Sequence, residues 1–407
     1  MDTTAIESLR AKPDEERHRT GYPAGFPTLP SVPAARYGDA EFAALEQRHV
    51  FGRSWLFVAH DDELPNTGDY LQVEAIPEPV FLVRGEDDVV RAFYNTCMHR
   101  GSALVLDQAG HAGRRLTCPY HSWAYTLDGR LAGYPDAGNF SDLDTDCHAL
   151  ATVRCEAWGP FIFINLDLSA PPLHDALRPV SDDLAEFDEM RGRLHLVGKR
   201  SREVPVNWKL PVDANIETYH VNTVHRDSAG NLLDQAKTAI WLLRQGHSRM
   251  LIATREAVGA LPEALPPVVE GLGDLPTLGT YSYHLFPNLS IVFGGRGFVF
   301  FIANWPTGAT TSRYDVHFFS SLAPSDDTRR LNERIIESVS KVLWEDLAVL
   351  PGMQRSIDAG VLPGLTLNYQ ERRIYHVHEH IDRLIGVEQV PESLRVPQLL
   401  GPFVEEA

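Results

Sequence analysis

Two pairs of metal-capable side chains within a short stretch constrain this chain more than any other feature. The stretch CMHRGSALVLDQAGHAGRRLTCPYH runs from Cys97 to His121 and contains Cys-x-His followed by Cys-x-x-His. A two-cysteine, two-histidine zinc finger groups its cysteine pair before a histidine pair that lies on a helix. Here each pair is mixed, and the sequence around both pairs is typical of strands and turns. The zinc-finger order therefore does not fit.

Two facing loops that each supply one cysteine and one histidine fit a Rieske [2Fe-2S] cluster. In that cluster one iron binds two thiolates and the other binds two neutral imidazoles, which raises the reduction potential relative to an all-cysteine ferredoxin. The stretch resembles the Rieske signature. It predicts four cluster ligands: Cys97, His99, Cys118 and His121.

A second group of histidines lies in NWKLPVDANIETYHVNTVHR, residues 207–226. His220 and His225 are five residues apart, so on a regular helix they point about 140° away from each other. They can bind one ion only if the helix expected near 213–225 ends or bulges there, as helices often do at functional sites. Two histidines and one carboxylate form the facial triad of non-haem Fe(II) oxygenases, which leaves positions open for O₂ and substrate. The pair therefore predicts a mononuclear iron site.

Together the two motifs resemble the Rieske non-haem iron oxygenases, in particular the large (alpha) terminal oxygenase subunit of the ring-hydroxylating family. The resemblance covers nearly the whole chain, from WLFVAH at Trp55 through FPNL at Phe286. It implies that the third iron ligand is Asp346, in VLWEDLAVLPGMQ, with Glu345 as its nearest rival. Pro351 is expected to shorten the helix that carries this ligand.

The family also uses a carboxylate three residues before the first iron histidine, and this position is Glu217 here. In the family it bridges the iron histidine to a Rieske histidine of the neighbouring subunit. The resemblance therefore implies electron transfer between subunits and a ring-shaped trimer, either a homotrimer or an α3β3 assembly with a small subunit. An asparagine usually precedes this carboxylate, but Asp213, Ala214 and Asn215 occupy that region without a clean register.

The expected fold class is α+β. Short β-branched and aromatic runs broken by turns predict a small β-sandwich, and helical stretches between later β-type runs predict an antiparallel sheet with helices on one side. The resemblance implies that the β-sandwich is an N-terminal Rieske domain and that the sheet with helices on one side is a catalytic helix-grip domain. The expected boundaries are an arm and helix at 1–49 that pack on the catalytic domain, the Rieske domain at 50–168 and the mononuclear iron domain at 169–407.

Charge and hydropathy exclude several other classes. The chain has 37 basic and 55 acidic side chains, a net charge of −18, which repels nucleic acid and anionic membrane surfaces. Its first residues lack an apolar signal region, and no run of about 18 apolar residues follows, which indicates a cytoplasmic protein without a membrane span. No G-x-G-x-x-G follows a strand, so NAD(P)H is expected to act only through a partner reductase.

The resemblance implies a terminal oxygenase that uses O₂ as co-substrate, takes electrons from a reductase with or without a ferredoxin, and acts on a small organic substrate. The leading interpretation is hydroxylation or dihydroxylation of an aromatic or apolar substrate, because the segments 281–295 and 297–305 are rich in side chains suited to line an apolar pocket. The alternative rests on Glu217, which resembles the bridging glutamate of carnitine and betaine oxygenases. It indicates hydroxylation or demethylation of a quaternary ammonium compound in an aromatic or acidic cage. A non-catalytic electron carrier and a hydrophobic-ligand binder remain as further classes.

Overall fold

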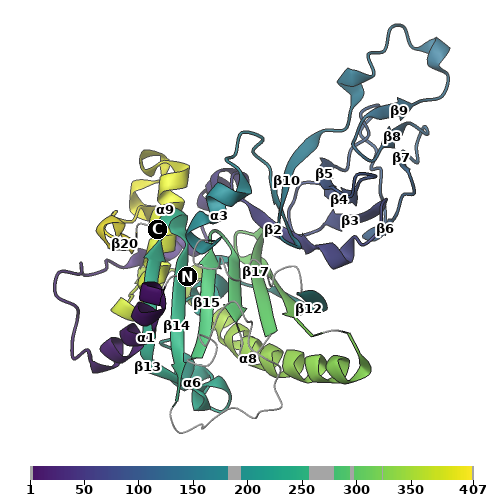
Figure 1. The fold of residues 1–407 in the computed structure, drawn as a ribbon. Helices are drawn as coiled ribbons and strands as arrows, with labels where there is room; N and C mark the ends of the chain where they lie inside the picture. Colours follow the sequence, from purple (N-terminus) through teal and green to yellow (C-terminus); the bar gives the residue numbers. More distant parts are fainter. Residues whose placement is uncertain (1–2, 182–193, 256–278, 294–297, 323, 406–407) are drawn as a thin grey trace. The chain divides into compact units, whose positions relative to one another are not determined.

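The chain forms two units in the computed structural model, which describes residues 3–181, 194–255, 279–293, 298–322 and 324–405 (Figure 1). The inserted unit is Gly52–Leu173, and the main unit combines Met1–Phe51 with His174–Ala407. The predicted α+β class is confirmed. Among the described helices, none is both long enough and apolar enough to cross a bilayer.

Two antiparallel sheets make up the inserted unit. The larger sheet has the strand order β2-β11-β10-β5-β4-β3-β6, and the smaller has the order β7-β8-β9. Buried side chains of the unit, Phe81, Trp123 and Tyr125 among them, form one core that also contains Cys97 and Cys118. The two cysteine loops are therefore anchored in packed structure. The strands are β2 Leu56–His60, β3 Asp69–Val73, β4 Val80–Arg84, β5 Val90–Tyr94, β6 Ala109–His111, β7 Arg115–Thr117, β8 Ala124–Thr126, β9 Leu131–Gly133, β10 Thr152–Trp158 and β11 Phe161–Asn165.

An eight-stranded sheet is the centre of the main unit, with the order β12-β18-β17-β16-β15-β14-β13-β20. All neighbouring pairs are antiparallel except β13 and β20. The central strands are buried along nearly their whole length, which explains why their sequences are continuous apolar runs. The strands are β12 His195–Val204, β13 Leu233–Leu243, β14 Ser248–Thr254, β15 Gly279–Leu285, β16 Leu289–Phe293, β17 Phe298–Gly308, β18 Thr311–Ser320 and β20 Val404–Glu405.

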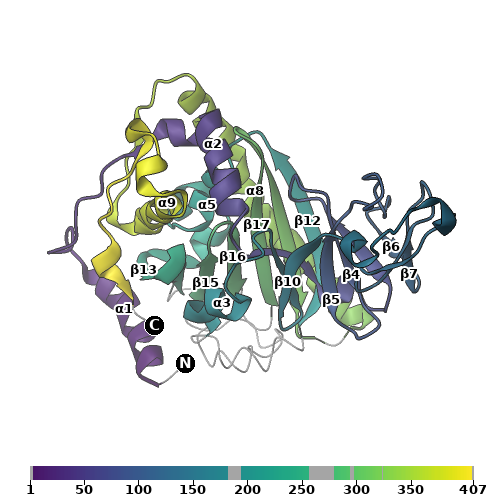
Figure 2. The same ribbon diagram turned by 90° about the horizontal axis from the view of Figure 1, so that it is seen from above.

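Helices α5, α8 and α9 lie on the same side of this sheet (Figure 2). In α9 the apolar positions Ile374, Val377, Ile381 and Ile385 recur at helical spacing and are all buried. A two-stranded pairing of β1 with β19 joins the N-terminal segment to the chain before α9. The elements are α1 Thr3–His18, β1 Val32–Pro33, the 3₁₀ turn η1 Ala34–Tyr37, α2 Ala40–Glu46, α3 Leu173–Ser181, α5 Lys209–Asn215, α6 Val221–Val224, α8 Asp326–Asp358, β19 Gly364–Leu365, the 3₁₀ turn η10 Tyr369–Glu371 and α9 Arg372–Ile385.

The helix expected near 213–225 is interrupted, as the spacing of the two histidines required. Helix α5 ends at Asn215, and the short α6 begins only at Val221. Between them the Glu217 side chain accepts a hydrogen bond from the Tyr219 backbone N–H. Such a side-chain acceptor competes with the helical carbonyls for that N–H, which favours the break.

The expectation that Pro351 shortens the late helix is wrong. Helix α8 continues past this residue to Asp358. A proline inside a helix costs about 3 kcal/mol because it removes one hydrogen bond and crowds the preceding turn. Here buried Gln354, one turn later, accepts from the Asn207 backbone N–H at 2.9 Å and donates to the Tyr37 carbonyl at 3.0 Å. These tertiary hydrogen bonds hold the turn that the proline disfavours.

Candidate functional site

His220, His225 and Asp346 converge in the main unit. Nε2 of His220 is 3.2 Å from Nε2 of His225, and the Asp346 Oδ1 atom is 3.3 Å and 3.0 Å from these two nitrogens. His220 and His225 flank α6 directly, so the short helix sets their spacing, and Asp346 comes from the buried face of α8. Of the described residues, this is the one group of three or more metal-capable side chains close enough to share an ion.

Both imidazoles are oriented by a carboxylate on the opposite ring nitrogen. Nδ1 of His220 contacts Glu217 Oε1, and Nδ1 of His225 lies 2.9 Å from Glu345 Oε2. Ser228 donates a further hydrogen bond to the same Glu345 oxygen at 2.5 Å. Carboxylates placed in this way hold the proton on Nδ1 and leave the Nε2 lone pair for a metal. Glu345, the rival for the third ligand, therefore lies behind His225 and outside the converging group.

The distances fit a single metal ion. Two ligand atoms bound at right angles, each about 2.1 Å from a first-row metal ion, lie about 3.0 Å apart. The three observed separations, 3.2, 3.3 and 3.0 Å, are close to this value. Two neutral imidazoles and one carboxylate are also the donor set that non-haem Fe(II) sites use.

The charges around the group favour a cation. Burial opposes the charged form of His220, but hydrogen bonds to Asp346 and Glu217 outweigh burial and raise its pKa to about 10. Burial likewise opposes ionisation of Asp346, yet its contacts with His220 and His225 lower the pKa of that carboxyl. A metal cation and protons therefore compete for the same atoms.

The four residues of the inserted unit also come together. The rings of His99 and His121 have centroids 4.8 Å apart, and the His99 ring stacks on Trp123 at 4.8 Å with an interplanar angle of 9°. Cys97 and Cys118 are each 2 % exposed. Each cysteine begins a tight loop: the Cys97 carbonyl accepts from Gly101 N–H at 2.8 Å, and the Cys118 carbonyl accepts from Ser122 N–H at 3.0 Å.

These residues fit a two-iron cluster better than a single ion. Nδ1 of His121 is buried and has no hydrogen-bond partner, which is what an imidazole nitrogen aimed at a metal shows. Desolvation, together with His121 and Arg100 nearby, lowers the pKa of His99 and favours the neutral ring that a metal needs. The four side chains do not form a group tight enough for one ion, as zinc would require. The Tyr125 hydroxyl lies 3.4 Å from the Cys97 sulfur and accepts from the Met98 backbone N–H.

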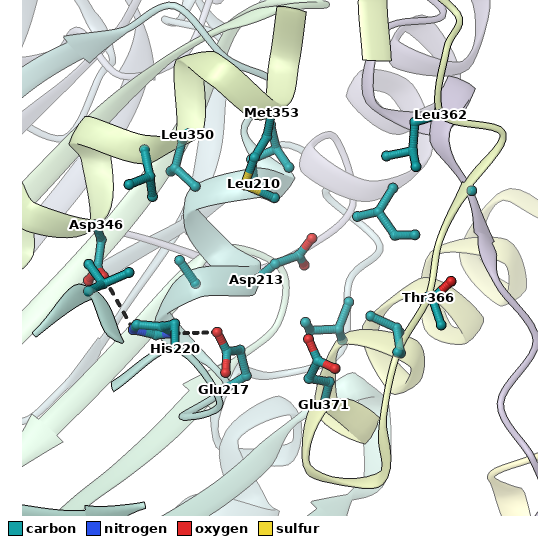
Figure 3. Close-up of a pocket in the computed structure, with 17 residues that line it drawn as sticks. Leu210, Asp213, Glu217, His220, Asp346, Leu350, Met353, Leu362, Thr366 and Glu371 are labelled. Atoms are coloured by element: carbon teal, nitrogen blue, oxygen red, sulfur yellow. Dashed lines mark hydrogen bonds and ion pairs between the residues drawn. The ribbon is translucent and has the colours of Figure 1, made fainter. Parts of the chain in front are cut away.

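A cavity of about 390 Å³ lies beside the His220 and Asp346 side chains (Figure 3). Residues of α5, α8, α9, the η10 turn and the 362–367 segment line it. Its polar lining is acidic: besides Asp346 it includes Asp213, Glu217 and Glu371. Burial raises the pKa of Asp213 to about 8 and also raises the pKa of Glu371. The apolar lining is formed by Leu210, Ala214, Val224, Val349, Leu350, Met353, Leu362, Leu365, Leu367 and Ile374.

The expectation that the late strands line the pocket is wrong for this cavity. None of the described residues in 281–305 is part of its wall. Their aromatic and branched side chains are buried in the core of the sheet instead. The apolar run reflects burial of the central strands on both faces, which sequence alone does not distinguish from a pocket lining.

Three acidic residues have positions at the site that the sequence does not predict. Asp213 was assigned no register in the motif, Glu345 was only a rival ligand, and Glu371 carried no signal. Asp213 lies seven residues before His220, which is about two helical turns. In a continuous helix this spacing would have placed the two side chains on the same face. No comparable signal exists for Glu371, because a loop and a turn bring it to the cavity.

Comparison with known proteins identifies two domains in the chain. The family model for the catalytic domain of the ring-hydroxylating alpha subunit matches residues 191–387, and the model for the Rieske [2Fe-2S] domain matches residues 54–153. The chain belongs to the Rieske oxygenase family. The predicted cofactors, a [2Fe-2S] cluster and a mononuclear iron, are confirmed at the level of the family.

Two curated relatives are oxygenase subunits. The carnitine monooxygenase oxygenase subunit of Escherichia coli K12 is 40 % identical over 195 residues. These residues are 48 % of this chain and 52 % of the relative, so the match spans about half of its length. The subunit of the same name from Acinetobacter pittii is 29 % identical over 346 residues, 82 % of this chain and 88 % of the relative. A solved structure of a quaternary ammonium Rieske monooxygenase has the same fold, with a TM-score of 0.74 at 24 % identity over 88 % of this chain and all of that one.

Proposed function

We propose that this chain is a terminal oxygenase in which two metal centres have separate tasks. Residues 50–168 hold the Rieske cluster and residues 169–407 the mononuclear iron, with the N-terminal arm and helix, 1–49, packed on the iron domain. The observation that supports this most strongly is the convergence of two imidazole Nε2 atoms and one carboxylate oxygen at separations of 3.0 to 3.3 Å. The proposed ligands are Cys97, His99, Cys118 and His121 for the cluster and His220, His225 and Asp346 for the iron.

Iron bound by two histidines and one carboxylate supplies the activation of O₂. The chain's own residues orient the ligands and place the substrate. Glu217 and Glu345 fix the two imidazole rings through their Nδ1 atoms. The apolar wall of the cavity excludes water from the reacting region, and the acidic groups orient the substrate.

Glu217 is also the proposed electron bridge. One of its oxygens contacts Nδ1 of His220, and its side chain is 11 % exposed. Its other oxygen accepts from the Tyr219 backbone N–H and has a lone pair left for a further hydrogen bond from an imidazole of a neighbouring subunit. That bond would connect cluster and iron between subunits. This role requires an oligomer, for which a trimer is the proposed form, and a reductase, with or without a ferredoxin, as electron donor.

The substrate that the cavity fits best is a small organic cation that carries N-methyl groups. Three carboxyl groups besides Asp346 can carry negative charge when they are ionised, and ten aliphatic or Met side chains offer contact area for methyl groups. The two relatives are named for carnitine, which contains a trimethylammonium group. The acidic lining supports the acidic form of the cage considered for such a substrate, since the described lining contains no Phe, Tyr or Trp.

Hydroxylation of an aromatic or apolar compound is the second candidate. The aliphatic wall, which forms most of the cavity surface, favours it. This candidate is disfavoured because an apolar substrate would displace water from several acidic groups, and the loss of their hydration costs free energy.

Single-turnover chemistry separates the candidates. The iron-loaded protein, reduced chemically under argon, is exposed to ¹⁸O₂ with a panel of N-methylated amines, aromatic acids and hydrocarbons, and products are identified by mass spectrometry. Labelled formaldehyde or a labelled alcohol from an N-methylated cation supports the first candidate, whereas label in a ring supports the second. The Asp346→Ala variant is the control, because it should retain the cluster but incorporate no label. Absence of label from every compound would refute the oxygenase proposal.

A further inference from the structure

Asp213 differs from the other acidic residues of the cavity because half of its carboxyl group is unused. The residue is 7 % exposed, and its Oδ1 atom is buried without a hydrogen-bond partner. Figure 3 shows the side chain extending from α5 into the cavity, toward the side that contains Leu362 and Glu371. A buried acceptor without a partner destabilises the fold unless something binds to it.

The other oxygen is held by a directed chain of buried hydrogen bonds. Arg36 has only donors, so its Nε–H, 3.0 Å from Nδ1 of His378, makes that nitrogen an acceptor. Burial and the Arg36 charge lower the pKa of His378 well below its usual value, so the ring is neutral and its proton lies on Nε2. Nε2–H therefore donates to the Tyr37 hydroxyl at 2.7 Å, and that hydroxyl donates to Asp213 Oδ2 at 2.6 Å. The chain fixes Oδ2 and leaves Oδ1 facing the cavity.

Positive side chains do not balance this charge within the cavity. None of the described lining residues is Lys or Arg. The nearby buried cations are engaged elsewhere: Lys209 pairs with Glu46 at 2.8 Å, and Arg36 pairs with Asp382 at 2.8 Å. A substrate carboxylate would therefore enter a site that offers it no cationic side chain among the described residues and several carboxyl groups that repel it.

We propose that Asp213 is the specificity-determining residue of this cavity: Oδ1 binds the cationic head group of the substrate, and the substrate is an organic cation without a carboxylate. This inference rests on the proposed function and narrows its substrate class. Carnitine, after which the two relatives are named, is a zwitterion with a carboxylate of its own and would be excluded. Tyr37 is a positioning residue, because it acts on the substrate only through Asp213.

The groups around Asp213 give the interaction a pH dependence. Burial raises its pKa to about 8, the Tyr37 hydrogen bond and Lys209 oppose that rise, and Glu371 and Glu217 add to it. A proton and a substrate cation therefore compete for Oδ1. Cation binding should strengthen as the pH rises and Asp213 ionises.

The test is calorimetric binding of three probes to the iron-loaded, anaerobic protein at pH 9, above the pKa of Asp213. Choline is the cation, 3,3-dimethylbutan-1-ol is its neutral isostere, and L-carnitine is the zwitterion. We expect choline to bind at least tenfold more tightly than either of the other probes. A single favourable charge interaction is enough to change the dissociation constant by about tenfold. Equal affinity for choline and its isostere would overturn the role of charge, and equal affinity for choline and L-carnitine would overturn the exclusion of carboxylates.

The Asp213→Asn variant keeps the shape and the acceptor for Tyr37 but removes the charge. Its choline affinity should fall about tenfold, while its affinity for the isostere should stay within twofold of the wild type. Glu41→Gln, an exposed acid on α2, is the matched control that removes one charge outside the cavity. Unchanged choline affinity in Asp213→Asn would overturn the assignment.

Tyr37→Phe provides an independent readout if Asp213→Asn folds poorly. Loss of the hydroxyl removes the hydrogen bond that favours ionised Asp213, so the pH at which choline affinity reaches half its maximum should move upward. The affinity at high pH should change little, which a disordered cavity would not reproduce. An unshifted pH profile would overturn the positioning role.

The two levels of the proposal fail in distinguishable ways. Label from ¹⁸O₂ in any product, combined with equal binding of choline and its isostere, would leave the oxygenase proposal standing and refute the role of Asp213. Selective choline binding that Asp213→Asn abolishes, combined with no label in any product, would do the reverse.

Discussion

Replacing Glu345 by alanine should weaken iron binding without removing an iron ligand. Glu345 Oε2 lies 2.9 Å from Nδ1 of His225 and accepts a second hydrogen bond from Ser228. Without the carboxylate, nothing keeps the proton of His225 on Nδ1. The ring also loses the contact that orients its Nε2 atom toward Asp346. A hydrogen bond to a charged group contributes about 1.5 to 3 kcal/mol.

The expected loss is near the lower end of that range. The Glu345 side chain is 26 % exposed, so solvent screens part of its charge. A loss of about 1.5 to 2 kcal/mol corresponds to roughly a ten- to thirtyfold higher dissociation constant for Fe(II). This agrees with the ten- to hundredfold effects typical of residues that orient metal-bound histidines.

Competition with a chelator of known affinity measures the change under argon. Glu333→Ala is the matched control, because it removes an exposed acid from the same helix three turns earlier, about 18 Å away along the axis. At that distance salt screens the interaction with the iron. Wild-type affinity in Glu345→Ala, or an equal loss in the control, would refute the reasoning.

Three further outcomes are expected. Glu217→Gln should keep both metal centres but slow the reoxidation of the reduced cluster by O₂ roughly ten- to a hundredfold, as measured by rapid mixing. Wild-type turnover would refute the bridging role. Lys209→Met should lower the free energy of unfolding of the main unit by about 3 to 5 kcal/mol in urea titrations, because it leaves Glu46 buried without its ion-pair partner and with only the Trp208 indole N–H as a donor. Arg178→Met, which breaks an exposed pair, is its control and should change that free energy little. The choline affinity of the wild type should rise about tenfold from pH 7 to 9 as Asp213, whose pKa burial raises to about 8, ionises; a flat profile would contradict the proposed contact.

The metal-binding motifs could be predicted because their information is local. The two Cys/His pairs and the His220/His225 pair lie in short segments, where spacing alone restricts the chemistry. Even the break in the helix followed from that spacing. Asp346 was different, since it lies far along the chain on a helix with several acidic residues, and only the resemblance to a family indicated it.

The cavity could not be predicted because its walls come from distant segments. In the sequence, Asp213 resembles any acidic residue of a helix. Only the structure shows that the Tyr37 hydroxyl, which also contacts His378, occupies one of its oxygens. Apolar strands suggested a pocket where the fold has a sheet core. Pro351 suggested a helix end, because propensity does not include the hydrogen bonds of Gln354 that only the folded chain makes.

The ion pair between Arg36 and Asp382 joins residues 346 positions apart in the chain, on either side of the inserted unit. During synthesis at about 5 to 20 residues per second, Arg36 emerges roughly 20 to 70 s before its partner. The inserted unit is complete at Leu173, well before the C-terminal helix exists. Maturation should therefore follow an order: the cluster can be installed on the nascent chain, whereas the cavity and its charge pattern form only after translation of α9.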